Sequence, residues 1–323
     1  MRTLVTGGAG YIGSVVAKQL LEAGHEVVVL DDLSRGHEAA IPPGARHLAI
    51  SLGAPAALDG ALEGIDAVVH FAALSLVAES VEHPERYWRN NVTGTLNLLD
   101  AMRAHDVRKL VFSSTAATYG EPERVPIVEQ EPTAPVNAYG ASKLAVDLML
   151  RDECVGHGLA ATSLRYFNVA GASGEQGEHH EPETHLIPLI LQAAAGKREH
   201  IKIFGTDYST RDGTAVRDYI HIEDLGDAHL LALDHLTAGE HRIYNLGTGD
   251  GFTVREVIEA SRRVTGEPIP AVEEARRPGD PPALVADASR AREELGWNPS
   301  RGLEDMIADA WAWHSAHPDG YAD

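Results

Sequence analysis

A glycine-rich turn near the start of the chain restricts the possible folds more than any other feature. Gly7, Gly10 and Gly13 follow the apolar run 2–6, a strand candidate, and open a segment with helical periodicity. A tight turn without Cβ atoms that leads into a helix N-terminus presents backbone N–H groups and the positive end of the helix dipole to a pyrophosphate. Because the turn lies between a strand and a helix, it predicts a dinucleotide-binding unit.

Two carboxylates follow the second strand candidate, residues 27–30. Asp31 and Asp32 come directly after it, and Asp31 lies 18 positions beyond Gly13. A carboxylate at this place accepts hydrogen bonds from the adenosine ribose and repels a 2′-phosphate, so NAD is favoured over NADP, although Arg35 is near. For Asp32 the simpler role of a solvated loop residue stays equally open.

Apolar runs alternate with longer segments of helical periodicity along the first half of the chain. Near-continuous apolar strands joined by helices predict an α/β fold with a doubly wound parallel sheet covered on both faces. After about residue 165 the pattern becomes less regular, and clusters of Gly, Pro and charge at 171–188 and 266–282 suggest loops of a smaller lobe. The strand candidates are 2–6, 27–30, 67–71 and 110–112, and the helical segments include 14–23 and 90–105.

The charge balance excludes one class of partner. The formal net charge of the 323 residues is −21, whereas nucleic-acid binding needs basic patches, so we expect no nucleic-acid partner. Cys154 is the single cysteine, which rules out an intrachain disulfide. The chain enters a strand at once without a signal peptide, and no apolar run approaches the roughly 18 residues that span a membrane. We therefore expect a cytoplasmic protein without a membrane partner.

Tyr139 and Lys143 carry the chemical signal. Four residues apart on a helix, their side chains lie on one face, and an ammonium beside a phenol is expected to lower the pKa of the phenol toward that of a general base. They follow the hydroxyl-rich strand end Ser113, Ser114 and Thr115 by about one loop. Together with the dinucleotide turn, this arrangement predicts hydride transfer.

These motifs make the chain similar to the extended short-chain dehydrogenase/reductase family, and within it to the UDP-hexose 4-epimerase branch. The resemblance runs nearly end to end, and several of its blocks are specific to that branch. The matching blocks are residues 5–14, 70–73, 90–92, 112–120, 139–143, 165–172, 212–214, 216–221, 277–280 and 286–287.

The resemblance implies a Rossmann domain, a bound NAD and a UDP-sugar substrate. It implies inversion of C4 of a UDP-hexose through a 4-keto intermediate, which interconverts UDP-glucose and UDP-galactose. It also implies a homodimer whose interface is built from the helices 90–105 and 139–151. We expect the NAD-binding Rossmann domain over residues 1–170, with 216–247 returning to it, and the UDP-sugar-binding lobe over 171–215 and 248–323.

The resemblance also assigns roles to individual residues. Tyr139 takes the proton from the sugar O4, Thr115 orients that oxygen, and Lys143 bonds the nicotinamide ribose and tunes Tyr139. The cofactor contacts that it implies are Gly7, Gly10, Tyr11, Ile12, Gly13, Asp31, Asp32, Ser51, Phe71, Ala72, Ala73, Asn91, Ser113, Tyr139, Lys143 and Tyr166. The implied substrate contacts are Thr115, Tyr139, Asn168, His185, Leu186, Phe204, Arg217, Tyr219, Arg277 and Asp280.

Charge-assisted bonds from Arg217 and Arg277 to the pyrophosphate suit these roles. An ion pair with the adjacent Asp218 is the plainer alternative for Arg217. No metal is expected at His179, His180 and His185, because Pro182 prevents a helical ligand pair and the family uses no metal.

The chain departs from the family pattern at several positions. Ser51 stands where many members have an Asp that holds the adenine amino group, and Leu74 and Ser75 stand where many carry a Lys. Leu284 stands where some members have a Tyr beside the C2 substituent of the hexose, although a plain core leucine is the alternative. The catalytic residues are unaffected.

Alternative functions remain in two classes. One is a 4-epimerase of another UDP-sugar, such as UDP-glucuronate or UDP-N-acetylglucosamine. The other is a non-catalytic NAD-binding sensor or scaffold, against which the intact Tyr139 and Lys143 argue. A dehydratase is disfavoured because Ala116 and Ala117 replace the Asp-Glu pair of those enzymes.

Overall fold

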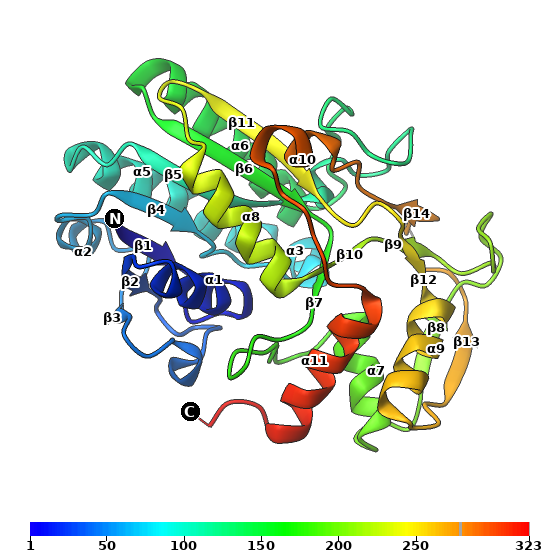
Figure 1. The fold of residues 1–323 in the computed structure, drawn as a ribbon. Coiled ribbons are helices and arrows are strands. Elements are labelled where there is room, and N and C mark those ends of the chain that lie inside the picture. The colour runs from blue at the N-terminus through cyan, green and yellow to red at the C-terminus, as the bar shows by residue number, and fades with distance from the viewer. Residues whose placement is uncertain (278–279, 323) are drawn as a thin grey trace.

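Strands and helices alternate through the part of the chain that this computed structural model describes, residues 1–277 and 280–322 (Figure 1). A π-helix (Trp88–Thr93) precedes α5, and 3₁₀ helices cover Glu38–Ala40 and Ala116–Thr118. The strands are β1 (Arg2–Thr6), β2 (Glu26–Leu30), β3 (Arg46–Leu48), β4 (Ala67–His70), β5 (Lys109–Thr115), β6 (Ala160–Tyr166), β7 (Asn168–Ala170), β8 (Ile201–Phe204), β9 (Val216–Arg217), β10 (Tyr219–His221), β11 (His241–Leu246), β12 (Phe252–Thr253), β13 (Ala271–Glu274) and β14 (Ala283–Leu284). The α-helices are α1 (Tyr11–Glu22), α2 (Pro55–Ala61), α3 (Val77–Glu82), α4 (Pro84–Tyr87), α5 (Gly94–Ala104), α6 (Ala138–His157), α7 (Leu186–Ala194), α8 (Ile222–Asp234), α9 (Val254–Thr265), α10 (Ser289–Leu295) and α11 (Leu303–Ala316).

Seven parallel strands form the central sheet in the order β11-β6-β5-β4-β1-β2-β3. The prediction of a doubly wound parallel sheet is therefore confirmed. The strand order reverses between β1 and β4, and sheets of this kind bind ligands beyond the carboxyl ends of the strands at such a switch point. Both the glycine turn after β1 and the hydroxyls at the end of β5 lie at that edge.

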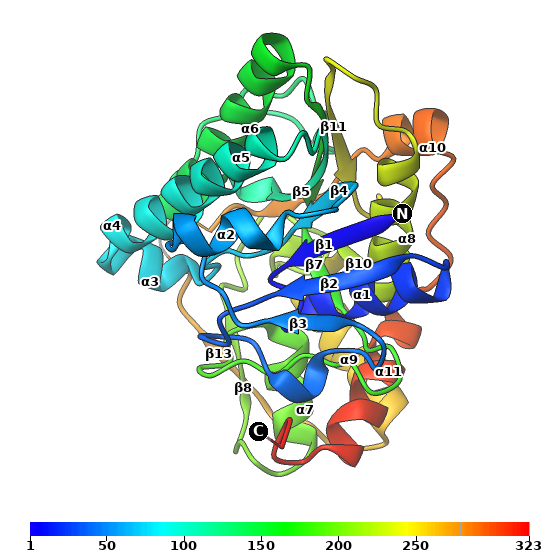
Figure 2. The same cartoon turned by 90° about the vertical axis from the view of Figure 1, so that its left-hand side faces the viewer.

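Helices cover both faces of the sheet (Figures 1 and 2). Successive residues of a strand point to opposite faces, and Leu4 and Val5 of β1 accordingly belong to different cores. Val5 packs with Leu20 of α1 and with side chains of α8 and α10, whereas Leu4 packs with Leu98 of α5 and with side chains of α2 and α6. Burial on both faces explains why these strands are apolar at nearly every position.

Short strands and three helices build a second region beside the sheet. β7 pairs with β10, β9 pairs with β12 and β14, and β8 pairs with β13. A third core joins α7, α9 and α11 through residues such as Ile190, Val257 and Met306. Between these segments the chain returns to the central sheet through α8 and β11.

The helix expected at 90–105 is divided in the structure, since the π-helix covers Trp88–Thr93 and α5 begins at Gly94. The helix around Tyr139 and Lys143 is α6, which continues to His157 and ends at Gly158 in the left-handed conformation. Within the described ranges, no helix combines the length and apolarity that crossing a bilayer requires.

Candidate active site

The glycine turn lies against the loop that follows β4. Gly7 has a φ of +73°, and a Cβ at Gly7 would lie 2.6 Å from the backbone nitrogen of Ala72. A Cβ at Gly13 would lie 2.2 Å from the carbonyl oxygen of Gly7. Only glycine fits these two close approaches, so the turn can present its backbone to a ligand.

The first turn of α1 supplies the donors for an anion. The helical bonding begins with the N–H of Ser14, which donates to the carbonyl of Gly10 at 2.9 Å. The N–H groups of Tyr11, Ile12 and Gly13 come before it and, as the first turn of a helix, have no intrahelical acceptor. These groups fit a pyrophosphate, as the sequence predicts.

Asp31 and Asp32 have different surroundings. Asp31 is buried, and its carboxylate accepts from the N–H of Ala9 at 3.0 Å and of Leu33 at 2.9 Å, so it braces the glycine turn. Burial raises the pKa of Asp31, whereas hydrogen bonds from Ser34 and Ser51, acting against burial, lower the pKa of Asp32. Ser51 therefore lies beside Asp32, in the loop after β3.

Thr115, Tyr139 and Lys143 meet where β5 ends and α6 begins. Asn137 caps α6 by accepting from the N–H of Gly140 at 2.8 Å. A Cβ at Gly140 would lie 2.4 Å from the carbonyl oxygen of Ala117, so glycine allows α6 to start close to the end of β5. The hydroxyl of Thr115 lies close enough to the phenol of Tyr139 to lower the pKa of that phenol, as expected for two groups that share one substrate oxygen.

The expected fall in the pKa of Tyr139 is not produced by the protein's own charges. Burial raises the pKa of Tyr139, and the hydrogen bond from Thr115 offsets only part of that effect. Lys143 Nζ donates to the carbonyl of Ser113 at 2.7 Å, and burial lowers the pKa of Lys143 to about 7. The prediction counted the attraction between ammonium and phenolate but not the desolvation of the phenol, which is the largest influence on the pKa of Tyr139 in the chain alone.

A buried ion pair behind Lys143 was not predicted from the sequence. Asp147 lies one turn beyond Lys143 on α6, and its Oδ2 accepts from Arg165 Nη2 at 2.8 Å and Nε at 3.1 Å. Both side chains are 3% exposed. Asp147 raises the pKa of Lys143 against the effect of burial, so it acts as a positioning residue. The spacing of four residues from Lys143 was an available signal for Asp147, but nothing in the sequence indicates Arg165 of β6 as its partner.

The other predicted cofactor residues line the ends of β4, β5 and β6. The N–H groups of Phe71 and Ala72 both donate to the carbonyl of Thr6, and Ala73 follows in the same loop. The hydroxyls of Ser113 and Tyr166 bond each other. Asn91 is buried and fastens Leu74 to α6, because it exchanges two bonds with the Leu74 backbone and donates to Ser142.

Several predicted substrate residues gather beside a hollow at the second region. Arg217 pairs with Asp280, and Arg277 lies with its guanidinium carbon 3.9 Å from the ring centre of Phe204. Arg277 and Asp280 line the hollow together with Glu121, Pro122, Arg276, Pro281 and Pro282. The structure thus brings Phe204 and Arg217 together with Arg277 and Asp280, which lie at least 60 positions further along the chain.

Asp218 does not pair with Arg217, which excludes the plainer alternative for that arginine. It is fully buried and accepts from the N–H groups of Thr248, Gly249 and Ala286 at 2.9, 3.1 and 3.0 Å. Its own carbonyl accepts from Asn168 Nδ2 at 2.9 Å. Asp218 therefore ties together three segments around the hollow.

Tyr219 and Leu186 have a more apolar setting than the sequence suggested. Tyr219 is 4% exposed and belongs to the core of the second region, against which Leu186 also packs. His185, the N-cap of α7, lies with its Nδ1 2.9 Å from carboxylate oxygens of both Glu178 and Glu183. Against burial, which lowers it, these two carboxylates raise the pKa of His185 to about 10.

Leu284 lies between the two halves of the site. In β14 it pairs in register with Arg217, and its side chain packs on the small cluster of Ala116, Tyr119 and Ile127. Phe167 packs on the same cluster.

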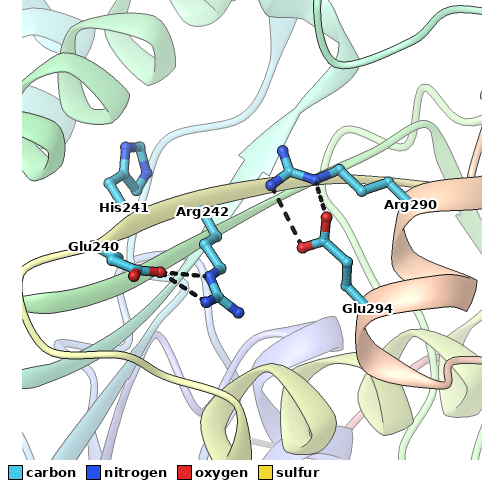
Figure 3. A pocket seen from close by; sticks show the side chains of 5 residues that line it. All are labelled: Glu240, His241, Arg242, Arg290 and Glu294. Atoms are coloured by element: carbon cyan, nitrogen blue, oxygen red, sulfur yellow. Dashed lines mark hydrogen bonds and ion pairs between the residues drawn. The ribbon is translucent and has the colours of Figure 1, made fainter.

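A second hollow, at the far edge of the sheet, has no place in this site (Figure 3). It is lined by Glu240, His241, Arg242, Arg290 and Glu294. Its charges are satisfied internally, because Arg242 pairs with Glu240 at 2.7 Å and Arg290 with Glu294 at 2.8 Å.

A dinucleotide turn at the switch point, with a Thr–Tyr pair and a buried lysine at the neighbouring strand end, defines an NAD-dependent enzyme of the short-chain dehydrogenase type. The chain belongs to the NAD dependent epimerase/dehydratase family, whose model matches residues 3–247.

Within this family, the chain is similar to UDP-glucose 4-epimerases in both sequence and structure. A UDP-glucose 4-epimerase of Streptomyces lividans is 58% identical over 323 residues, which cover 99% of this chain and 98% of the relative. The crystal structure of UDP-glucose 4-epimerase from Brucella ovis in complex with NAD has a TM-score of 0.93 and 46% identity, over 96% of this chain and 97% of that chain. The crystal structure of UDP-glucose 4-epimerase from Bifidobacterium longum in complex with NAD+ and UDP has a TM-score of 0.93 and 38% identity, over 99% of this chain and 100% of that chain.

Proposed function

We propose that this protein is an isomerase that inverts C4 of a UDP-hexose with NAD as a resident cofactor, and so interconverts UDP-glucose and UDP-galactose. The observation that carries the proposal is that Thr115 and Tyr139 lie close together at the strand edge that also holds the glycine turn. Relatives that match over nearly their whole length bear the name UDP-glucose 4-epimerase, and related structures hold NAD and UDP.

The glycine turn and the strand ends would hold NAD. The N–H groups at the start of α1 would receive the pyrophosphate, and the carboxylate of Asp32, with Ser51 beside it, would accept hydrogen bonds from the adenosine end. When bound, NAD supplies the hydride acceptor and donor for C4 of the sugar. The remaining cofactor contacts are Phe71, Ala72, Ala73, Asn91, Ser113 and Tyr166.

The chain's own residues handle the proton. Tyr139 accepts the proton of the sugar O4 and returns it, Thr115 orients that oxygen, and Lys143 would bond the nicotinamide ribose. Tyr139 and Lys143 are both buried, so few neighbours set their pKa values. Thr115 lowers the pKa of Tyr139, and Asp147 raises that of Lys143.

The UDP moiety is expected at the hollow of the second region. Arg217 and Arg277 provide charge-assisted donors for the pyrophosphate, Phe204 provides an aromatic face for the uracil, and Asn168 and Asp280 provide polar contacts. His185, Leu186 and Tyr219 shape the adjoining wall. This arrangement holds the nucleotide firmly and the sugar loosely, which a sugar that must rotate between two hydride transfers requires.

Further proposals concern the organisation of the molecule. We keep the division into a cofactor domain, 1–170 with 216–247, and a substrate lobe, because α8 and β11 pack on the central sheet while α7, α9 and α11 form their own core. A homodimer is supported by apolar side chains exposed on neighbouring helices, such as Leu96 of α5 and Leu148 of α6. The cytoplasm is the location that we propose for it. A monomer in sedimentation experiments would contradict the dimer.

The direct test is turnover without added cofactor. The purified protein is incubated with UDP-galactose, and product is followed by chromatography together with the dinucleotide that denatured protein releases. Formation of UDP-glucose and release of NAD are expected, with Tyr139→Phe as the inactive control. Release of NADP would contradict the role of Asp31 and Asp32, and selective turnover of UDP-glucuronate or UDP-N-acetylglucosamine would change the substrate.

A further inference from the structure

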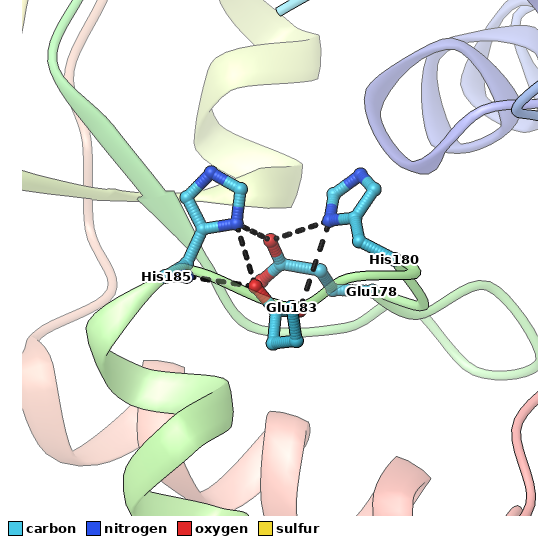
Figure 4. Close-up of side chains that lie close together, drawn as sticks. All are labelled: Glu178, His180, Glu183 and His185. Carbon is cyan, nitrogen blue, oxygen red and sulfur yellow. Dashed lines mark hydrogen bonds and ion pairs between the residues drawn. The ribbon is translucent and has the colours of Figure 1, made fainter. Parts of the chain in front are cut away.

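Four potential metal ligands converge in the loop that precedes α7. Glu178, His180, Glu183 and His185 each offer one ligand atom, and these four atoms lie within 4.8 Å of one another (Figure 4). Neither the proton transfer nor the UDP contacts proposed above require Glu178, His180 or Glu183. We propose that these four side chains form a binding site for one divalent transition-metal ion, with Zn²⁺ as the preferred ion.

The spacing between the ligand atoms matches a tetrahedral site. With Zn–N and Zn–O bonds of about 2.0–2.2 Å, neighbouring ligand atoms of a tetrahedron are separated by roughly 3.3–3.6 Å. His185 Nδ1 lies 2.9 Å from an oxygen of Glu178 and 2.9 Å from an oxygen of Glu183. His180 Nδ1 lies 3.2 Å from the same Glu178 oxygen and 3.7 Å from the other oxygen of Glu183. The separations from the two histidines to the shared Glu178 oxygen, 2.9 and 3.2 Å, are therefore slightly shorter than the tetrahedral value, and small side-chain movements would bring them to it.

The direction of one imidazole supports a common centre. Among the described residues, His180 Nδ1 is a buried nitrogen that makes no hydrogen bond, although two carboxylates lie near it. Buried ring nitrogens normally make a hydrogen bond, and a buried nitrogen without one costs stability. In Figure 4 the Nδ1 atoms of both histidines face the two carboxylates from opposite sides. A metal ion among the four groups would give His180 Nδ1 a direct bond in place of its ion-pair contacts with Glu178 and Glu183.

The donor set favours zinc in a structural role. Two imidazoles and two carboxylates suit Zn²⁺, and four protein ligands leave no open position for substrate. The two glutamates also balance the ion's charge when the imidazoles are neutral. Glu178 is buried, whereas the His185 side chain is 48% exposed, so an ion can enter from the solvent side.

The expectation of no metal relied on helical spacing, which does not apply to this loop, and on the resemblance to a family that needs no metal for its chemistry. Residues 178–185 lie outside any helix, and the turn of the loop, which includes Pro182, brings the ligands together. His179 is not part of the group, because its ring stacks on that of His37 at 4.6 Å.

The site would fasten the loop to the cofactor domain. The ring of His180 lies edge-on to Tyr11 at 6.5 Å, and the Tyr11 hydroxyl donates to the carbonyl of Gly171 at 2.7 Å. Arg35 Nη1 donates to the carbonyl of Glu181 at 3.0 Å. An ion held by residues 178–185 therefore stabilises a segment that contacts the glycine turn and continues into α7.

A metal-binding titration tests the proposal without reference to turnover. The purified protein with its cofactor is dialysed against a chelator, and the affinity for Zn²⁺ is measured in competition with a chromophoric chelator, with metal content by mass spectrometry. We expect one tight equivalent per chain. Loss of a ligand in Glu183→Gln or His180→Gln should weaken it more than about 100-fold, because even groups behind the ligands contribute about 10–100-fold.

Glu181→Gln is the matched control, since it removes the same charge from the same loop without touching a ligand. It should keep the wild-type affinity. Equal affinities in wild type and Glu183→Gln, or no tight equivalent in wild type, would overturn the proposal in favour of two histidine–carboxylate ion pairs.

If the variants fail to fold, X-ray absorption spectroscopy of the zinc-loaded wild-type protein identifies the ligands of the ion. Two imidazoles and two oxygen ligands at about 2.0–2.2 Å are expected. Any other number of imidazoles would contradict the assignment.

Discussion

Replacing Asp147 with asparagine tests the buried ion pair behind the catalytic lysine. Asp147 and Arg165 are each 3% exposed, and one oxygen of Asp147 accepts both N–H groups of Arg165. The Asp147→Asn change would keep the size of the side chain but remove its charge. The guanidinium of Arg165, which also lies 4.9 Å from the Tyr119 ring centre, would then be buried without a counter-ion.

The expected loss in the free energy of unfolding is about 3–5 kcal/mol, the usual effect of removing one partner of a buried pair. The pair is not optimal, because Asp147 Oδ1 is buried without a hydrogen bond, so replacing both partners should be much less harmful. We expect the free energy of unfolding of the double variant Asp147→Leu/Arg165→Met to be higher than that of the wild type or lower by no more than about 1 kcal/mol.

Urea unfolding at pH 7 measures these differences in the protein with its cofactor. The matched control is Asp152→Asn on the same helix, whose carboxylate pairs with Arg151 at 2.9 Å but is 71% exposed. An exposed pair contributes about 0–1 kcal/mol, so this variant should be close to wild type. If Asp147→Asn is no less stable than Asp152→Asn, the reasoning about burial is refuted.

The same variant has a second readout in the pH dependence of turnover. Burial lowers the pKa of Lys143 to about 7, and the Asp147 carboxylate raises it against that effect. Without this charge the pKa of Lys143 should fall further, so the alkaline limb of the pH–rate profile should move to lower pH. An unshifted limb would separate the structural role of Asp147 from any influence on Lys143.

Three other predictions concern the site itself. Tyr139→Phe should reduce kcat by about 10²–10⁴-fold while UDP binding, measured by calorimetry, is kept, and Thr115→Val should reduce it less because it removes orientation and not the base; the reverse order would move the base elsewhere. Ser51→Asp should tighten NAD retention, because a carboxylate accepts from the adenine amino group more strongly than a hydroxyl; unchanged or weaker retention would show that Ser51 is not at the adenine or that the pocket is rearranged. Leu284→Tyr should suppress kcat/KM for UDP-N-acetylglucosamine more than for UDP-glucose, and Leu284→Gly should raise it, since the side chain lies between the two halves of the site; equal changes for both sugars would mean that it does not read C2.

The main features of the fold were predictable because their signals are local. The apolar run before Gly7 and the carboxylates after residue 30 each occupy a few consecutive residues, and the parallel sheet follows from the alternation of such runs with helical segments. The division between the π-helix and α5 was missed, because the sequence 88–104 carries one continuous helical pattern.

The electrostatics of the site could not be predicted from sequence neighbours. The spacing of Tyr139 and Lys143 correctly places both on one helix, but their burial depends on packing against β5 and reverses the expected shift in the pKa of Tyr139. Asp218 illustrates the same limit, since its adjacent Arg217 pairs with Asp280 instead.

The sequence by itself determined the cofactor turn and the helix that carries Tyr139 and Lys143, because glycine requirements and helical spacing act over one or two turns of chain. Only the tertiary structure decided which distant groups meet: Asp147 with Arg165, and Glu178 with His180 and His185 in a loop without helical spacing. Such pairings depend on how strands and loops are brought together in the folded chain. Desolvation and charge at the site depend on them in turn, because both are set by neighbours in space.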